Sequence, residues 1–382
     1  MATATDLSPI ETAKALQALV REHAEQAEEQ GYVSELVVRA LAEAGLYRLC
    51  APAVFGGAEA DPITTIKVIE AISAGDGATG WALMIGIETV GIGGSLMAPE
   101  TAATLFAERP DLVMCGALNP QGRARRVDGG WMVNGRWPFA SGCHFAHYFW
   151  GQCIVDGSSP TKFVEILVPR ADYEVLDTWH VNGLQGSGSH DVAVRDLFVA
   201  DAMTTDVRSQ HPQHEGTLFR LPPYSRLAYN KVGVSLGIAR TALDEFTAIA
   251  EGKVPRLMSR PLRERPRAQL AIAHAEAILR SARAFCFEAV QEEWDFVAAG
   301  GVADRKQRAM VRLASSWACQ EAMRAVRRVC DAAGTTPNFD GSLLGRCLRD
   351  VQVVPQQVMV APHFIEDAGR VLLGLDPLEP IL

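Results

Sequence analysis

The periodicity of the sequence changes twice along the chain, and this limits the folds that the chain can adopt. Up to about residue 110, apolar residues recur at the spacing of amphipathic helices. Over the next ninety or so residues, β-branched and aromatic residues alternate between turn-forming pairs. After Pro222-Pro223 the helical spacing returns in long segments. We therefore expect an α+β fold in three parts, namely a helical domain over 1–110, an antiparallel, barrel-like β domain over 111–210 and a helical bundle over 211–382.

Short local signals place the elements within these parts. Ser8-Pro9-Ile10-Glu11 is a capping box with proline at the first helical position, and Gly31 is expected to end the helix that it starts. Asn134-Gly135 is a turn pair, so we expect it to break a strand over 131–140. Long helices are expected over 224–250, 267–299 and 305–333.

Composition excludes several classes of function. The net charge of −9 argues against a nucleic acid as the main partner, because phosphate binding needs a basic surface. Eight cysteines occur without a C-x-x-C pair, which is typical of reduced thiols in a cytoplasmic protein. The most apolar stretch, 81–98, contains Glu88 and four glycines, so it predicts a buried helix and no membrane segment. No signal peptide is evident at the start of the sequence.

The segment 134–150 carries the most distinctive side chains. If it is extended, Trp137, Phe139 and Ser141 lie on one face and offer a flat apolar surface beside a hydroxyl group. Gly142 lets a ligand approach the backbone closely. A buried strand with core aromatics is the competing interpretation. His144 and His147 follow three residues apart, but no third ligand accompanies them, so no metal site is expected and one of them at most belongs to a pocket.

A basic loop follows the first long helix of the C-terminal part. Five arginines lie between 256 and 267, with Glu264 as the only acid. Guanidinium groups match the geometry of phosphate oxygens, so the loop is either a clamp for the phosphates of a ligand or a mobile, solvated turn.

Several short motifs appear in an order that resembles the acyl-CoA dehydrogenase superfamily. The resemblance covers nearly the whole chain and implies a helical domain, a β domain and a four-helix bundle that together hold a flavin. The matching pieces are Leu46-Tyr47-Arg48, Phe55-Gly56-Gly57, Asp76-Gly77-Ala78-Thr79-Gly80-Trp81, Asn119-Pro120, Asp128-Gly129-Gly130, Asn134-Gly135, Gly334-Thr335 and Arg349-Asp350.

Within that superfamily the closer resemblance is to the oxygenase components of two-component flavin-dependent monooxygenases, such as the hydroxyphenylacetate and dibenzothiophene monooxygenases. Trp137 to Gly142, the Gly186-Ser187-Gly188-Ser189 run and the tail around Arg370 carry it. The resemblance implies that Ser141 lies near the flavin N5. The flavin contacts that it implies are Asn119, Trp137, Phe139, Ala140, Ser141 and Gly142. It also implies a dimer or tetramer in which four residues reach the flavin of a neighbouring subunit, namely Arg256, Gln269, Gly334 and Thr335.

The sequence lacks the carboxylate that a dehydrogenase needs as a base. Gln357 and Val358 occupy the position after Asp350 where the resemblance places that glutamate, and no acid occurs between Gly216 and Asp244. Glu366 and Asp367 come two turns later, where an exposed helical face explains them.

We therefore expect an oxygenase that takes FMNH2 or FADH2 from a separate reductase and reacts with O2 through a C4a-(hydro)peroxide to hydroxylate an aromatic small molecule. We expect Ser141, together with Gln357 or His363, to assist oxygen activation. Trp81, Trp137 and Phe139 are expected to exclude water from the site. Trp81 and His144 are expected to line the substrate pocket. The alternatives are an FAD-dependent acyl-CoA dehydrogenase, which has the same fold, and a non-catalytic flavin carrier.

Overall fold

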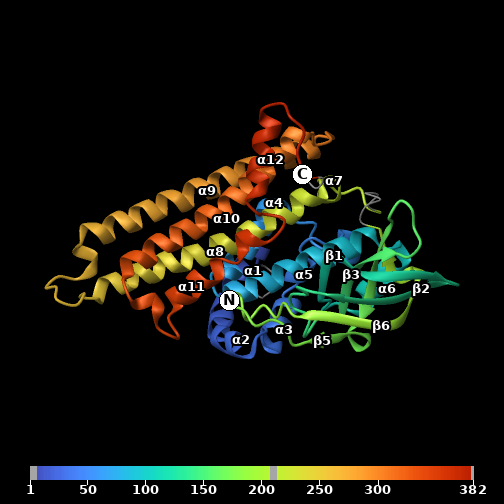
Figure 1. The fold of residues 1–382 in the computed structure, drawn as a ribbon, viewed down its shortest axis with the longest axis horizontal. Helices are drawn as coiled ribbons and strands as arrows, with labels where there is room; N and C mark the ends of the chain where they lie inside the picture. The colour runs from blue at the N-terminus through green and yellow to red at the C-terminus, as the bar shows by residue number, and fades with distance from the viewer. Residues whose placement is uncertain (1–6, 207–212, 380–382) are drawn as a thin grey trace.

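The chain has helices towards both ends and a sheet between them (Figure 1). The computed structural model describes residues 7–206 and 213–379. Within these residues the last N-terminal helix ends at Glu108, the strands lie between Met114 and Thr205, and helices resume at Thr217. The α+β class expected from the change of periodicity is confirmed, because each change of pattern coincides with a change of element type.

The N-terminal helices begin and end largely where the local signals place them. Ser8 Oγ accepts the backbone N–H of Glu11, and the Glu11 carboxylate accepts the N–H of Ser8, so the capping box is formed. Gly31 ends the following helix in the left-handed conformation, with φ of 80°. The expected single helix is divided at His23, where no proline or glycine marks the break. The elements are α1 (Pro9–Glu22), α2 (Ala24–Gln30), α3 (Glu35–Glu43), α4 (Pro62–Ser73), α5 (Gly77–Leu96) and α6 (Pro99–Glu108).

The seven-stranded sheet runs in the order β5-β6-β2-β1-β3-β4-β7. Its pairs are antiparallel except β1 and β3, which are parallel, so the expectation of a wholly antiparallel sheet is wrong. The cause is the connection over 138–147, which brings the chain back across the sheet so that β3 runs in the direction of β1. The strands are β1 (Met114–Val127), β2 (Gly130–Trp137), β3 (Tyr148–Val155), β4 (Phe163–Pro169), β5 (Glu174–Leu176), β6 (Asp191–Ala200) and β7 (Thr204–Thr205).

Asn134-Gly135 forms a β-bulge within β2 and does not turn the chain. The pairing with β6 shifts between Val133 and Gly135, and the strand continues to Trp137. A Cβ on Gly135 would come within 2.5 Å of the Trp137 ring, so the glycine leaves room for that ring. The turn at Asp128-Gly129 is confirmed, because it joins β1 to β2 with Gly129 at φ of 72°.

The C-terminal helices extend away from the sheet as a long bundle (Figure 1). The three long helices start and end within a few residues of their expected positions. The elements are α7 (Thr217–Arg220), α8 (Pro223–Gly252), α9 (Pro266–Ala298), α10 (Arg305–Ala333), α11 (Leu343–Val351) and α12 (His363–Leu372).

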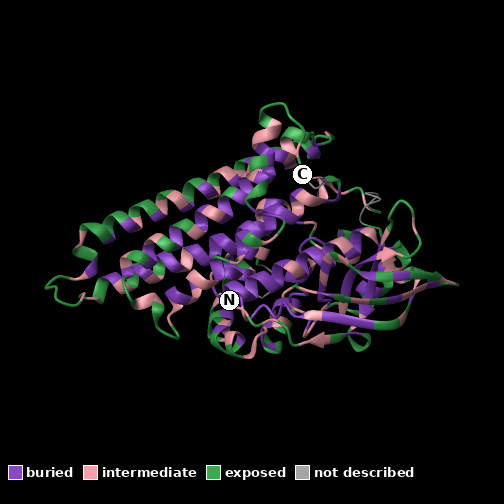
Figure 2. Ribbon diagram, in the orientation of Figure 1, coloured by how far each residue is buried: buried purple, intermediate pink, exposed green. Residues whose placement is uncertain are grey.

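Helix α5 lies at the centre of the molecule, packed against β1 on one side and α8 on the other. It is buried almost throughout, as the purple ribbon between sheet and bundle shows (Figure 2). Lys231 Nζ of α8 lies 2.6 and 2.7 Å from the two carboxylate oxygens of Glu88 on α5, and both side chains are buried. This ion pair fixes α5 relative to the bundle.

The structure describes all the cysteines and the long apolar helix α5. All eight cysteines are free thiols with buried side chains. Within residues 7–206 and 213–379, none of the helices combines enough length with enough apolar character to cross a bilayer.

Candidate functional site

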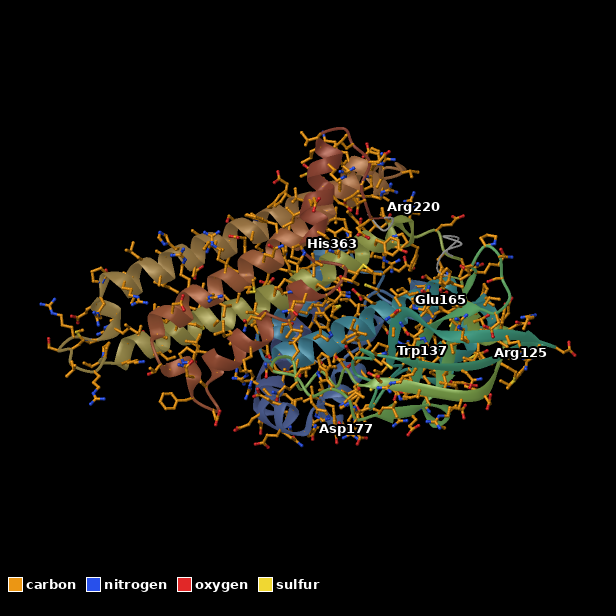
Figure 3. The ribbon with its side chains drawn as sticks, viewed as in Figure 1. Arg125, Trp137, Glu165, Asp177, Arg220 and His363 are labelled. Atoms are coloured by element: carbon orange, nitrogen blue, oxygen red, sulfur yellow. The ribbon has the colours of Figure 1, made fainter. Side chains whose placement is uncertain are left out.

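The chain turns sharply where β2 ends, and this separates two aromatic rings that the sequence placed on one face. Trp137 is completely buried; its ring packs against Phe149, and its N–H donates to the Gln152 carbonyl at 2.7 Å. Phe139 has φ of 65° and is 63% exposed. The shared face expected for Trp137, Phe139 and Ser141 is therefore wrong, because the extended backbone stops at Trp137. Trp137 belongs to the core of the sheet (Figure 3).

Ser141 sits in the turn after Phe139 and is buried. The indole N–H of Trp81, near the start of α5, donates to Ser141 Oγ at 3.0 Å. Ser141 Oγ also lies 2.7 Å from Ser189 Oγ, which in turn lies 2.7 Å from Ser187 Oγ. The backbone N–H groups of Ala140 and Gly142 donate to the carbonyls of His190 and Ser187, so the two loops are joined along their length.

The loop between Trp179 and His190 is held from several sides. Asp350 of α11 accepts the N–H of Leu184 at 2.6 Å, and the indole N–H of Trp179 donates to the Leu184 carbonyl. A Cβ on Gly183 would come within 2.1 Å of the Arg349 carbonyl, so only glycine allows this approach. Burial, then the neighbouring carboxylate of Asp76, raises the pKa of Asp350 to about 7.

A small enclosed cavity lies beside Ser141. Its volume of about 20 Å³ is enough for one water molecule and too small for an aromatic ring, so a substrate needs side chains to move. Apolar and aromatic side chains dominate the lining, and none of the carboxylates, lysines or arginines in 7–206 and 213–379 contributes to it. The lining residues are Val33, Val38, Tyr47, Ala82, Val113, Met114, Ser141, Gly142, His144 and Phe145.

The two candidate histidines have different environments. The ring of His144 stacks on Tyr32 with centroids 4.0 Å apart and lines the cavity. Burial, then the nearby His190 and Arg170, lowers the pKa of His144 to about 4, so its ring is neutral at pH 7. His147 Nδ1 instead accepts the N–H of Val113 at 3.0 Å and connects the start of β1 to β3. Of the two, His144 is the one at the cavity.

The residues proposed for oxygen activation in the tail lie on the helical side of the molecule. Gln357 follows a short 3-10 turn, and its side-chain oxygen accepts the N–H of Met359 at 2.7 Å. His363 is the exposed first residue of α12, with its ring against Phe364 (Figure 3). Neither side chain lines the cavity at Ser141.

The two tail acids also differ from expectation in one respect. Glu366 is exposed, as expected from a helical face. Asp367 is buried, and its two oxygens accept the N–H groups of Leu378 and Glu379, so the expectation of an exposed face is wrong for it. Its carboxylate is occupied in holding the chain after α12.

The remaining flavin-contact candidates fall into two places. Asn119 is exposed on β1, where its side-chain oxygen accepts from Gln121 Nε2 at 3.2 Å. The other four lie at the end of the bundle that points away from the sheet (Figure 1), where Lys253 Nζ donates to the Ala333 carbonyl and to Thr336 Oγ1. These four are Arg256 in the loop after α8, Gln269 at the start of α9, and Gly334 and Thr335 after α10. One chain does not bring them to Ser141.

Sequence reasoning missed the contribution of the N-terminal part to the cavity. Val33 comes from the short link between α2 and α3, Val38 comes from α3, and Tyr47 comes from a 3-10 turn. The sequence does not distinguish these residues from core residues, because an apolar residue at such a position is interpreted as part of the hydrophobic core. Ser187 and Ser189 were seen only as part of a glycine-rich loop, because a loop has no periodicity that shows which of its side chains face one another.

The chain is similar to known proteins over most of its length. The acyl-CoA dehydrogenase N-terminal domain matches residues 11–97, and the acyl-CoA dehydrogenase C-terminal domain matches residues 231–362. An indole-3-acetate monooxygenase of Pseudomonas putida is 34% identical over 91% of this chain and 89% of its own length. The oxygenase subunit of a flavin-dependent monooxygenase of Rhodococcus jostii is 28% identical over 95% of this chain and 93% of its own length. The crystal structure of a 3-HSA hydroxylase from Rhodococcus superposes with a TM-score of 0.90 at 25% identity, covering 99% of this chain and 100% of the other.

Proposed function

The chain belongs to the acyl-CoA dehydrogenase superfamily and, within it, to the flavin-dependent monooxygenases, and on this premise we propose that it hydroxylates an aromatic small molecule whose ring enters the cavity beside Ser141. The observation that carries the proposal is the cavity lining, to which the described part of the chain contributes no carboxylate. Removal of a proton beside a carbonyl group needs such a base, whereas oxygenation does not. When bound, reduced flavin supplies the two electrons with which O2 gives one oxygen atom to the substrate and one to water.

The surroundings of Ser141 fit a bound flavin ring. Phe139 presents an exposed aromatic face two residues from Ser141, and its ring meets the edge of Trp179 with centroids 6.1 Å apart. Its positive φ holds a non-glycine residue in a strained conformation, which is common at ligand sites. Phe139, Ala140, Ser141 and Gly142 form one continuous turn that would hold the ring, while the buried Trp137 supports the turn from behind. The Ser141 hydroxyl supplies a polar contact to that ring.

The cavity also indicates what kind of substrate it takes. Its lining offers aromatic and aliphatic contacts, two hydroxyl groups and a neutral imidazole, so an uncharged aromatic ring suits it. None of the described cationic side chains lines it, so a carboxylate buried there would remain unpaired. We infer that the ring system enters the cavity and that any acidic side chain of the substrate points out of it.

The test is oxygenation by the purified protein supplied with reduced flavin and ¹⁸O2. A panel of indoles and phenols, each with and without a carboxylate, is offered with FMNH2 and with FADH2. We expect one ¹⁸O atom in the product of at least one neutral aromatic compound. Heat-inactivated protein with the same flavin is the control, because free reduced flavin yields only hydrogen peroxide.

The same preparations test the dehydrogenase alternative. Oxidation of an acyl thioester without oxygen bleaches bound FAD, so bleaching with any member of an acyl-CoA panel supports that alternative. Bleaching together with no ¹⁸O incorporation across the aromatic panel would overturn the proposed oxygenation.

We further propose that the flavin site is completed by a second copy of the chain in a dimer or tetramer. Two features of the far end of the bundle support this. Arg256, Gln269, Gly334 and Thr335 lie there, away from Ser141. The same end also exposes apolar side chains, with Leu257 95% and Phe339 65% exposed. Reduced flavin reaches the site from a separate reductase, so any source of reduced flavin should support turnover.

The subunit proposal is tested by the oligomeric state. Light scattering after size exclusion should give a multiple of the chain mass, and Leu257→Asp should lower both that mass and the affinity for flavin. A monomer that binds flavin as tightly as the wild-type chain would contradict this part of the proposal.

A further inference from the structure

Three serine hydroxyls form a continuous buried line beside the cavity. Ser141 Oγ lies 2.7 Å from Ser189 Oγ, and Ser189 Oγ lies 2.7 Å from Ser187 Oγ. All three side chains are buried. From the other side, the indole N–H of Trp81 donates to Ser141 Oγ at 3.0 Å. The four groups make one hydrogen-bonded line from α5 to the loop before β6, which we call the serine line.

The number of hydrogens limits how the serine line can be ordered. An indole N–H only donates, and each serine hydroxyl has one hydrogen to donate. If Ser141 donates to Ser189 and Ser189 donates to Ser187, the last hydrogen belongs to Ser187. Within the described residues, Ser187 Oγ has no hydrogen-bond partner besides Ser189, so this hydrogen is buried without an acceptor. Such an arrangement is unfavourable. The order in which both neighbours donate to Ser189 is equally unfavourable, because the hydrogen of Ser189 is then buried without an acceptor among the described residues.

The opposite order leaves the free hydrogen where a ligand can use it. Ser187 then donates to Ser189, and Ser189 donates to Ser141. Ser141 Oγ accepts two hydrogens, one from Ser189 and one from Trp81, and its own hydrogen is free. Because Ser141 lines the cavity, that hydrogen can point to an acceptor there. Accepting two hydrogen bonds also strengthens Ser141 as a donor, since hydrogen bonds in a chain polarise one another.

We propose that Ser187 and Ser189 are positioning residues that direct the Ser141 hydroxyl into the cavity, where it donates to an oxygen or nitrogen atom of the bound flavin or substrate. The inference rests on the proposed function for the identity of that acceptor, and on the hydrogen count alone for the direction of the serine line. Neither Ser187 nor Ser189 lines the cavity, so both act through Ser141.

The backbone holds the serine line independently of its hydroxyls. Gly142 N–H donates to the Ser187 carbonyl at 3.0 Å, and the Cys143 thiol donates to the Gly188 carbonyl at 3.5 Å. Gly188 has φ of 57° and packs against Tyr32, where a Cβ would come within 2.9 Å of the Tyr32 Cβ. A serine-to-alanine change therefore removes a hydroxyl and leaves the loop in place.

The first measurement uses the flavin-free protein. In chain labelled with ¹⁵N-tryptophan, the indole N–H of Trp81 is one of seven such resonances and is assigned with Trp81→Phe. We expect Ser187→Ala to shift the Trp81 resonance although Ser187 does not touch Trp81. The shift should vanish when Ser187→Ala is made in a Ser141→Ala background. Ser95→Ala is the matched control, because Ser95 is a buried serine of α5 that donates to the Ile92 carbonyl, outside the serine line.

The second measurement is the fraction of reduced flavin whose oxidation yields hydroxylated product, the rest appearing as hydrogen peroxide. We expect this fraction to fall about fivefold in Ser189→Ala and in Ser187→Ala, as for the loss of one net hydrogen bond. Ser187→Ala should cause no further fall when added to Ser141→Ala, because its effect passes through Ser141.

The results separate this inference from the proposed function. If wild-type protein makes product but Ser187→Ala matches it in both measurements, the inference is wrong and the function stands. Independent, multiplying effects of Ser187→Ala and Ser141→Ala would also overturn it, as would an equal effect of Ser95→Ala, which would indicate general loosening. If wild-type protein makes no product, the proposed function fails, while the Trp81 resonance still decides the direction of the serine line.

Discussion

Removing the buried lysine that joins α8 to α5 should destabilise the protein strongly, and by an amount that depends on pH. Lys231 Nζ contacts both oxygens of Glu88. After Lys231→Met, the only partner that the described residues leave to that carboxylate is Asn230 Nδ2 at 3.2 Å. An unpaired buried charge costs about 3–5 kcal/mol. Burial already raises the pKa of Glu88, and loss of Lys231 raises it further.

The sign of the pH dependence follows from that direction. A carboxyl group whose pKa is raised by folding stabilises the folded state below its unfolded pKa, and this contribution is lost as pH rises through the folded pKa. The deficit of Lys231→Met should therefore be larger at pH 8 than at pH 5.5. Glu88→Gln added to Lys231→Met removes the buried charge and should restore about 1–2 kcal/mol.

Urea denaturation of the three proteins at both pH values, followed by circular dichroism, measures these differences. The reasoning is refuted if Lys231→Met is as stable as the wild-type chain, or if its deficit is the same at both pH values. A deficit that Glu88→Gln deepens would also contradict it, because the double variant has no charge left at the position of this ion pair.

Three further perturbations test other parts of the structure. Asp350→Asn keeps an acceptor for Leu184 N–H but cannot ionise. Because burial raises the pKa of Asp350 to about 7, the variant should gain stability relative to wild type as pH rises from 4 to 8. Thermal unfolding measures this, and a stability difference that does not change with pH would count against it. Ala82→Leu fills the cavity and should raise KM for an aromatic substrate about tenfold while leaving flavin affinity within about twofold; equal losses of both would show that the cavity is not a separate substrate site. Arg256→Ala should weaken flavin binding about tenfold in a salt-dependent way in fluorescence titration, and unchanged affinity would remove that residue from the flavin site.

The order of helices, sheet and helices was predictable because hydrophobic periodicity reports directly on element type. Capping at Ser8 and the left-handed glycine at Gly31 were equally readable, since each depends only on adjacent residues. The turn predicted at Asn134-Gly135 was wrong because the same pair of residues suits both a turn and a bulge. Whether the pair forms one or the other depends on pairing with β6, which is far away in the sequence.

The candidate site was predictable only in part, because its geometry depends on contacts between residues that are far apart in the sequence. Ser141 and Trp81 were both singled out, but their hydrogen bond joins residues sixty positions apart and leaves no local trace. Trp137 was assigned to the ligand surface because alternation was extended past the end of β2. The positive φ of Phe139, which places that residue at the surface and Trp137 in the core, is set by tertiary packing.

We propose above that the site beside Ser141 uses reduced flavin and O2 to hydroxylate a neutral aromatic ring. Its most direct test is mass spectrometry of product formed under ¹⁸O2 from indole, with reduced flavin supplied chemically. We expect one ¹⁸O atom per product molecule in wild-type protein and a large shift towards hydrogen peroxide in Ser141→Ala. Product labelled from H2¹⁸O instead of ¹⁸O2, or equal product yields from the two proteins, would contradict it.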